Sequence, residues 1–397
     1  MKLRARLLRA TLRERGGYRL VIISTIKRPV WAVRHALRGY REYGTAAVRA
    51  GASPLRQLLV TWWTHLRYLV PADVVYRYVL FDRGGAGASR HYCITGAGMP
   101  LVYNVARAVS GAEVANTLAD KRRFAAWCEA QGLPSVPTVA EFDAGAVSRS
   151  YVAGGELPRT DLFSKWGTSF GGEATNCWCY KDGWYFGRDR QPLSSTELFA
   201  QLAAQSRNGV VLLQPRLVNH PAIARLSPRA LSTIRVMTTM RPGMPPQFLT
   251  AVLRMATGDA TADNFAQGGI AAPVDSATGV LGNARGLDDI GWTQLHRTHP
   301  DTGVPIVGLQ LPCWPESVRL ALRAHALLGG VPVVGWDVAV LPGGPVLVEG
   351  NWNPCIKLVQ VATQTPVLNT EFAACLLEWI GESVRGKGDA WLVAAAA

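Results

Sequence analysis

The last quarter of the chain gathers three oxygen-bearing side chains whose spacing could hold a metal ion. Two apolar runs, Val338–Leu341 and Val346–Val348, flank a Pro-Gly-Gly turn, which predicts a β-hairpin. Asp337 begins the first strand, Glu349 ends the second, and Asn351 follows two residues later. Because a hairpin brings its open ends together, we expect these side chains to converge on a hard cation, Mg²⁺ above all, whose remaining ligands phosphates and waters supply. The alternative is that the carboxylates only mark solvated strand ends.

Two lysines and a glycine-rich loop in the first half of the chain could bind phosphate. Lys121 lies in the first turn of a helix predicted over residues 118–132, and a helix start favours an anion. Lys165 ends a strand that begins at Asp161. A hairpin predicted over residues 176–187 would hold the glycine-rich loop that follows Lys165 as a flap. That loop offers backbone and hydroxyl donors to phosphate oxygens from Gly167, Thr168, Ser169, Gly171 and Gly172.

Three further strands carry polar or charged side chains. A buried strand over residues 210–214 runs into a segment whose backbone could present an N–H and a carbonyl to a purine: Gln214, Pro215, Arg216 and Leu217. The other two strands place Arg235 and Arg254 within apolar alternations. Such arginines must meet an anion or carbonyl groups, because burying a guanidinium without a partner is costly. A polar turn over residues 263–269 follows.

The positive charge of the chain is concentrated in its N-terminal region. Of the net charge of +14, residues 1–50 carry +11 (13 Lys and Arg against two Glu), which leaves +3 for residues 51–397. Residues 1–16 and 30–48 show amphipathic helical patterns, and residues 55–70 indicate another helix. Such basic helices could pack their apolar stripes on the protein, or make a peripheral contact with an anionic membrane or an acidic partner. Nucleic acid is a less favoured partner for these helices, and no nucleic-acid binding is expected.

Composition favours a globular cytoplasmic protein. Apolar residues make up 48% and charged residues 18% of the 397 residues, which is typical of a globular chain large enough for two or three subdomains. The seven cysteines are an odd number, and no paired C-x-x-C metal motif is among them, which favours reduced thiols in the cytoplasm. No apolar run approaches the length of a membrane span.

The order of these motifs resembles the ATP-grasp superfamily. The motifs follow one another in a fixed order along the chain. An Asp-Lys pair comes first, then a lysine at the end of a strand followed by the glycine-rich flap, and then a strand that ends in a glutamine hinge. Two strands with one arginine each, a turn with an asparagine, and the pattern Asp…Glu-x-Asn complete the order. The amino-acid sequences of residues 232–238, 264–269 and 349–354 are similar to those of the sugar-transfer associated branch of that superfamily. The resemblance covers residues 90–385 and leaves residues 1–75 outside it.

The resemblance implies an α+β fold, the ATP-grasp fold, in which two α+β subdomains clamp ATP after a basic helical N-terminal region. ATP would be bound by Lys121, Lys165, the loop Gly167, Thr168, Ser169, Gly171 and Gly172, and an adenine hinge made of Gln214, Pro215, Arg216 and Leu217. Mg²⁺ would be held by Asp337, Glu349 and Asn351. The candidate catalytic residues are Arg235 and Arg254, which would steady the transferred phosphate, and Asn264.

The same resemblance divides the chain into five expected parts. They are a basic helical region (1–75), an N-terminal subdomain (76–135), a central subdomain with the glycine flap (136–217), a C-terminal subdomain with the metal hairpin (218–385) and a tail (386–397).

The implied activity is that of an ATP-dependent carboxylate–amine ligase, which forms a peptide-like amide through an acyl-phosphate and releases ADP and phosphate. Its substrates would be a small carboxylate and an amine, such as an amino acid, a peptide or an amino-sugar derivative. Two alternatives stay open: a phosphotransferase on the same scaffold, and a non-enzymatic membrane- or protein-binding module that uses the basic N-terminal helices. His220 could act as a general base for the amine or hold a structural hydrogen bond.

Overall fold

The computed structural model describes residues 18–81, 84–92, 99–152, 156–167, 176–369 and 371–387. The helix predicted over residues 1–16 and the loop residues Thr168, Ser169, Gly171 and Gly172 lie outside these ranges.

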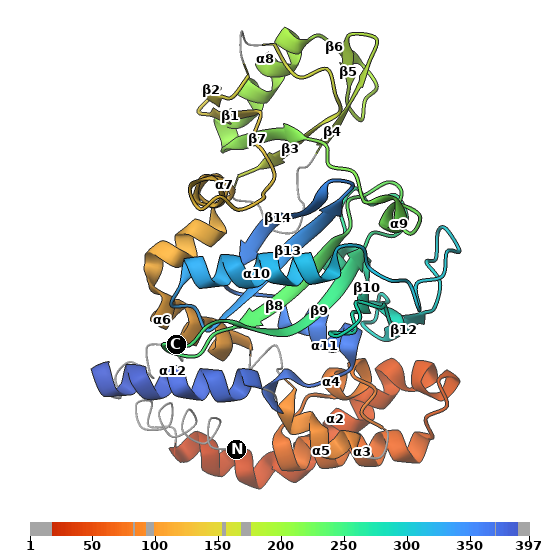
Figure 1. Ribbon diagram of the computed structural model, residues 1–397. Coiled ribbons are helices and arrows are strands. Elements are labelled where there is room, and N and C mark those ends of the chain that lie inside the picture. Colours follow the sequence, from red (N-terminus) through yellow and green to blue (C-terminus); the bar gives the residue numbers. More distant parts are fainter. Residues whose placement is uncertain are drawn as a thin grey trace.

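The chain begins with a group of helices packed at one end of the molecule (Figure 1). They are α2 (Tyr18–Arg49), α3 (Pro54–Tyr68), α4 (Ala72–Arg77) and α5 (Gly85–Ala88), followed by the 3₁₀ helix η1 (Ser89–His91). Ser53 caps α3, since its Oγ accepts a hydrogen bond from the backbone N–H of Arg56 (3.3 Å), and Pro54 takes the first helical position, where no N–H is needed. The helices predicted over residues 30–48 and 55–70 are confirmed.

Two helices lead from this group to the rest of the molecule. They are α6 (Met99–Ala119) and α7 (Lys121–Ala130). Asp120 separates them: its carboxylate accepts hydrogen bonds from the backbone N–H groups of Arg122 (2.8 Å) and Arg123 (3.3 Å), as an N-cap residue does. The helix expected from residue 118 therefore starts at Lys121, because the cap interrupts the helical path.

A first seven-stranded sheet forms the end of the molecule opposite the N-terminal helices (Figure 1). Its strands run in the order β2-β1-β7-β3-β4-β5-β6. Their bounds are β1 (Ala140–Asp143), β2 (Ala146–Ser150), β3 (Leu162–Trp166), β4 (Asn176–Lys181), β5 (Trp184–Phe186), β6 (Pro192–Leu193) and β7 (Val211–Pro215). Helix α8 (Ser195–Gln205), which begins with a capping box between Ser194 and Glu197, packs Leu198 and Leu202 on this sheet, and η3 (Ser206–Asn208) follows it.

A second seven-stranded sheet lies in the middle of the molecule, in the order β12-β11-β10-β9-β8-β13-β14. Its strands are β8 (Thr233–Thr239), β9 (Gln247–Met255), β10 (Ile270–Pro273), β11 (Ala284–Leu287), β12 (Thr293–His296), β13 (Val333–Leu341) and β14 (Gly344–Asn351). All pairings in the two sheets are antiparallel. The hairpin predicted around the Pro-Gly-Gly turn is confirmed as β13–β14.

Helices cover both faces of the second sheet. They are α9 (Pro221–Ala224), α10 (Trp314–Leu328), α11 (Ile356–Thr363) and α12 (Glu371–Lys387), with the 3₁₀ helices η4 (Phe265–Gln267) and η5 (Val367–Asn369). The main apolar core joins α10 to this sheet and includes the fully buried Trp336. Within the described residues, no helix combines the length and the apolarity needed to cross a membrane.

Candidate functional site

A row of charged side chains crosses three neighbouring strands of the second sheet. In the strand register Asp337 of β13 lies opposite Arg235 of β8 on one side and opposite Glu349 of β14 on the other. Directly opposite residues in antiparallel strands point to the same face of a sheet. The hairpin therefore brings Asp337 and Glu349 together, as the sequence predicts, and adds Arg235 to the same row.

Two arginines hold Asp337 in place. Arg235 binds the Asp337 carboxylate through Nε and through Nη2 (3.1 Å), and Arg254 Nη2 donates to Asp337 Oδ2 (2.8 Å). Burial acts to raise the pKa of Asp337, but the charges of Arg235 and Arg254 outweigh it and lower that pKa. Burial likewise opposes the charge of Arg235, and Asp337 outweighs this and raises the pKa of the guanidinium. Asp337 and Arg235 are therefore charged and buried, and the partly buried Arg254 is fixed in direction by the same carboxylate.

A second carboxylate, that of Asp263, orients Arg254 in addition to Asp337. Asp263 Oδ1 lies 3.2 Å from Arg254 Nη2, and Asp263 Oδ2 accepts hydrogen bonds from the backbone N–H (2.7 Å) and the hydroxyl (2.6 Å) of Thr233. The Thr233 hydroxyl also accepts from Arg254 Nη2 (2.6 Å). Burial raises the pKa of Asp263, and the bonds to Arg254 and Thr233 offset part of that rise. Thr233 and Asp263 thus set the direction of Arg254.

The open end of the hairpin carries the other two metal-ligand candidates. Asn351 Nδ2 donates to Glu349 Oε1 (3.2 Å) and lies 3.4 Å from the carbonyl oxygen of Gly335. The carboxyl group of Glu349 is close enough to that of Asp337 to influence its pKa. Two neighbouring carboxylates repel each other unless a proton or a cation lies between them, so this pair favours a cation.

The two predicted phosphate-binding lysines lie near each other and near Glu349. Burial lowers the pKa of Lys165 to about 8; the Glu349 charge raises it and the Lys121 charge lowers it further. Burial also lowers the pKa of Lys121, against the charges of Glu349 and Asp120. The backbone N–H of Lys121 donates to the carbonyl oxygen of Gly167 (3.3 Å), which ties the start of α7 to the start of the glycine-rich loop.

Within the described parts of the chain, the side chain of Lys165 makes no hydrogen bond and no ion pair. Strand alternation explains its direction: Leu162 and Ser164 are buried behind β3, whereas Phe163 and Lys165 face the other way, into a cavity. A buried ammonium group without a partner is costly, and such groups are typical of sites that bind an anion.

That cavity has a volume of about 1220 Å³, and residues of both sheets line it. Ligand pockets commonly measure about 300–1,000 Å³, so this one has room for a nucleotide and a second molecule. The apolar side chains Val136, Phe163, Leu231 and Val348 line it together with the predicted hinge residues Gln214, Pro215, Arg216 and Leu217.

The predicted hinge has a defined anchor. The backbone N–H of Arg216 donates to the carbonyl oxygen of Asp161 (2.9 Å), and Arg216 Nη1 lies 3.0 Å from Asp161 Oδ2. These two bonds attach the segment after β7 to the start of β3. The backbone that leaves β7 is therefore held along the cavity wall.

The cavity continues from the hairpin to α11 and to the loop after β11. Lys357, in the first turn of α11, lines this end with Asp288 and Gly291. Burial lowers the pKa of Lys357, and the charge of Arg77 from the N-terminal helices lowers it further. Arg77 is partly buried beside Gly291 and pairs with Asp73 (3.1 Å), while its Nε atom is buried without a partner in the described residues. Lys357 therefore lines this end of the cavity beside the carboxylates Asp288 and Asp289.

Two predicted residues have local structural roles. The Asn264 side chain accepts a hydrogen bond from the backbone N–H of Ala266 (3.1 Å) and caps η4, and Asn264 also lines the cavity. His220 caps α9, since its Nδ1 accepts from the backbone N–H of Ala222 (3.2 Å). Of the two readings of His220, the structure supports the structural one.

Sequence reasoning missed four residues of this site: Phe163, Thr233, Asp263 and Lys357. Phe163 and Thr233 could have been found, because each lies two residues from a predicted site residue on the same strand and so on the same face. Asp263 stands beside the predicted Asn264, but its pairing with Arg254 depends on how β9 and the loop after it pack. Lys357 has no motif around it in the sequence.

Comparison with known families finds a match for the segment that holds the β13–β14 hairpin. Residues 192–373 match the family model described as sugar-transfer associated ATP-grasp. The resemblance to the sugar-transfer associated ATP-grasp branch that the sequence predicts is thereby confirmed for residues 192–373, and the structure around them is α+β with helices at its N-terminus. Comparison of the sequence with curated proteins gives no match.

Several solved structures are similar at low sequence identity. A D-alanine-D-alanine ligase from Coxiella burnetii matches at 11% identity and TM-score 0.36, over 68% of this chain and 61% of that one. An L-amino acid ligase from Bacillus licheniformis matches at 12% identity and TM-score 0.35, over 66% of this chain and 47% of that one. A D-alanine-D-alanine ligase from Bacillus anthracis matches at 12% identity and TM-score 0.38, over 77% of this chain and 79% of that one. The chain thus spans less than two thirds of the length of the first two.

Proposed function

We propose that the protein is an ATP-dependent carboxylate–amine ligase that joins a small carboxylate to an amine and releases ADP and phosphate. The match to an ATP-grasp family supports ATP as co-substrate, and the arrangement of charges in the cavity supports the reaction class.

The observation that carries the proposal is Lys165. Its side chain faces the cavity with a pKa lowered to about 8, and the described residues offer it no hydrogen-bonding anion. Lys121 stands close enough to lower that pKa further. Two ammonium groups near each other at the edge of a large cavity suit a polyanion such as the phosphate chain of a nucleotide.

The residues around the hairpin fit Mg²⁺. In the described part of the chain, no three His, Cys, Asp or Glu side chains gather to hold a metal by themselves. Two carboxylates and an amide, Asp337, Glu349 and Asn351, fit a cation that keeps several water and phosphate oxygens in its shell, as Mg²⁺ does. When bound there, the ion would neutralise charge on the phosphate oxygens. Lys165 and Lys121 would hold the same phosphates from the side of the first sheet.

Arg235 and Arg254 would stabilise the negative charge that develops during phosphate transfer. Attack of a carboxylate oxygen on the γ-phosphorus forms one P–O bond and breaks the bond to ADP, while negative charge gathers on the transferring oxygens. Arg235 and Arg254 are already oriented by Asp337, and Arg254 by Asp263 as well, so they can stabilise this charge without rearranging. The amine then forms the C–N bond and displaces phosphate from the acyl carbon, losing a proton to water.

The far end of the cavity would hold the carboxylate substrate. Lys357 lines it, and Arg77 stands near enough to lower the Lys357 pKa. An anionic group on the substrate would pair with the Lys357 ammonium group at this end of the cavity. We therefore propose that one substrate carries a negative charge besides the reacting carboxylate.

Product analysis tests the proposal. The protein is incubated with ATP, Mg²⁺ and pairs drawn from amino acids, dicarboxylic acids and amino sugars, and products are identified by mass spectrometry. The proposal expects ADP and phosphate in equal amounts with a new amide, and only when both substrates are present. Release of AMP and pyrophosphate would overturn it, and a stable phosphorylated metabolite without an amine requirement would identify a phosphotransferase instead.

A further inference from the structure

Helix α3 faces the body of the protein with its polar side and solvent with its apolar side. Its buried residues are all polar: Gln57, Thr61, Thr64 and His65. Its exposed residues include Leu55 (67% exposed), Leu59 (53%) and Trp63 (46%). These three recur every four residues and so form one stripe along the helix. In a helix that only packs on its own protein, the apolar stripe is the buried one.

The polar side of α3 is held by specific bonds, so its orientation is not arbitrary. Gln57 Nε2 donates to the carbonyl oxygen of Ala52 (2.9 Å), and Gln57 Oε1 accepts from the Tyr76 hydroxyl of α4 (3.2 Å). His65 Nδ1 bonds to the carbonyl oxygen of Val70 (3.1 Å), and its ring stacks on that of His35 from α2 at 4.0 Å. Rotating the helix to bury its leucines would break these contacts.

Helix α2 also exposes apolar side chains, although its buried side is apolar too. Its small residues and one tyrosine are buried against the body: Ala32, Ala36, Gly39, Tyr43 and Ala47. Another set of residues is apolar and exposed: Val30 (60% exposed), Val33, Leu37 (48%) and Val48. At 100° per residue this second set is centred about 120° around the helix from the first. We call the exposed apolar residues of both helices the outer α2–α3 surface: Val30, Val33, Leu37, Val48, Leu55, Leu59 and Trp63.

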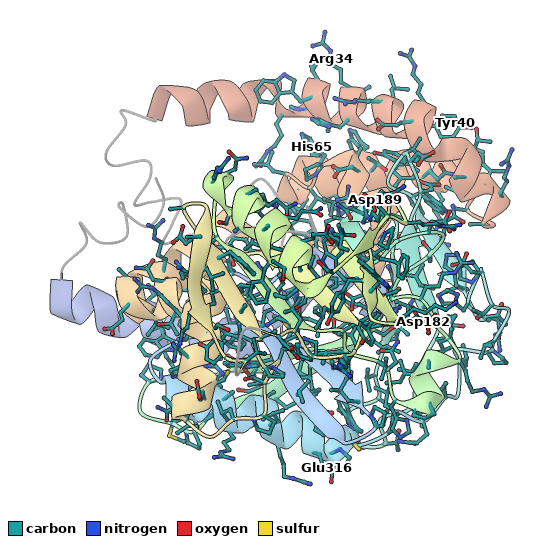
Figure 2. All side chains as sticks on the ribbon, turned by 90° about the horizontal axis from the view of Figure 1, so that it is seen from above. Arg34, Tyr40, His65, Asp182, Asp189 and Glu316 are labelled. Carbon is teal, nitrogen blue, oxygen red and sulfur yellow. The ribbon has the colours of Figure 1, made fainter. Side chains whose placement is uncertain are left out.

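The charges around this surface have one sign. Residues 28–69 contain seven arginines and one acidic residue, Glu42, which pairs with Arg38 (3.7 Å). Six of these arginines are exposed: Arg34, Arg38, Arg41, Arg49, Arg56 and Arg67. Figure 2 shows Arg34 extending from α2 away from the body of the protein, whereas His65 lies on the inner side. The surface thus combines apolar side chains with cations.

We propose that the outer α2–α3 surface docks on an anionic membrane. The two helices would lie in the plane of the bilayer surface, with leucines, valines and Trp63 entering the boundary between headgroups and acyl chains and the arginines contacting acidic headgroups. Tryptophan favours this boundary because its ring is apolar and its N–H is polar. The absence of a membrane-crossing helix among the described residues fits an in-plane contact.

Charge distinguishes this occupant from a second copy of the chain. Two copies meeting through this surface would bring a net charge of +6 from each side together, and like charges repel. An anionic membrane supplies the opposite sign over the whole surface. The N-terminal helices that carry the surface lie at the end of the molecule opposite the first sheet (Figure 1).

Vesicle sedimentation with the full chain tests the proposal. Vesicles of phosphatidylcholine with about 30% phosphatidylserine are compared with pure phosphatidylcholine, and we expect binding to the anionic vesicles to be tighter by about tenfold or more and to weaken with salt. The triple variant Leu55→Ser, Leu59→Ser and Trp63→Ser should bind anionic vesicles at least about tenfold more weakly, because it loses three inserted side chains.

Matched controls separate membrane docking from general stickiness and from misfolding. The variant Met244→Ser, Leu295→Ser and Leu327→Ser removes three exposed apolar residues elsewhere and should bind like the parent chain. Circular dichroism should show unchanged helix content in both variants. The proposal is overturned if the parent chain does not bind anionic vesicles, or if the α3 variant binds as tightly as the parent. It is also overturned if the parent chain forms a dimer that the α3 variant dissociates, which would identify a second copy as the occupant.

Discussion

Replacing Lys165 with methionine should stabilise the fold and weaken nucleotide binding at once. The pKa of Lys165 falls from its ordinary 10.5 to about 8 because burial disfavours its charge. At about 1.36 kcal/mol per pH unit, keeping this lysine charged at pH 7 costs the folded state about 3.4 kcal/mol. The side chain is partly exposed to the cavity, which reduces this cost, so we expect Lys165→Met to raise the free energy of unfolding by about 1–3 kcal/mol.

The pH dependence of that gain has a definite sign. Between pH 8 and 10.5 the unfolded chain binds a proton at Lys165 that the folded chain has lost, so the stability of the parent protein rises with pH through this window. The advantage of Lys165→Met is therefore largest below pH 8 and shrinks above it. Chemical denaturation at pH 7 and pH 9.5 measures the difference.

The same variant should lose affinity for ATP. One charge-assisted hydrogen bond to phosphate contributes about 1.5–3 kcal/mol, so calorimetry should show a Kd about 10- to 100-fold higher. The control is Lys181→Met, which removes an exposed lysine from the end of β4 and should change neither property. A destabilised Lys165→Met protein, or one with the ATP affinity of the parent, would refute the reasoning about this lysine.

Four further predictions concern the same cavity. The Kd for ATP should rise by up to about tenfold per pH unit above pH 8, because Lys165 loses its proton there. The variant Lys165→Arg should flatten this pH profile, because arginine stays charged. An equal slope of Kd against pH in both proteins would contradict this prediction. Glu349→Gln should abolish nearly all turnover with the fold intact, measured as ADP release, because it removes a charge from the proposed metal site; retained activity at saturating ATP and Mg²⁺ would exclude that role. Arg235→Lys should lower kcat by about 10²-fold or more, since lysine lacks the two-pronged donor that now binds Asp337, while the Kd for ATP changes far less. Lys357→Gln should raise KM for the carboxylate substrate about tenfold and leave the Kd for ATP unchanged; the reverse pattern would place Lys357 at the nucleotide.

The sequence predicts the hairpin and its side chains well because the information is local. A Pro-Gly-Gly turn between two apolar runs determines the pairing, and the pairing places Asp337 opposite Glu349. Arg235 and Arg254 were predicted to need an anion. That this anion is Asp337 follows only from the neighbouring positions of β8, β9 and β13, which no short segment encodes.

The N-terminal helices show what periodicity cannot determine. The spacing of Leu55, Leu59 and Trp63 indicates a helix with an apolar stripe, and the helix is confirmed as α3. A stripe does not say which side faces the body. Here hydrogen bonds of Gln57 and His65 hold the polar side inward, so the stripe is exposed.

Transfer of isotope from the carboxylate substrate tests the central claim most directly. The reaction is run with a carboxylate labelled with ¹⁸O at both oxygens, and the released phosphate is examined by ³¹P NMR, in which each bound ¹⁸O shifts the resonance. The proposed acyl-phosphate route joins one carboxylate oxygen to the γ-phosphorus, so phosphate should carry one ¹⁸O for each amide formed. Unlabelled phosphate, with label transferred instead to AMP or retained entirely in the amide and unreacted acid, would contradict the account.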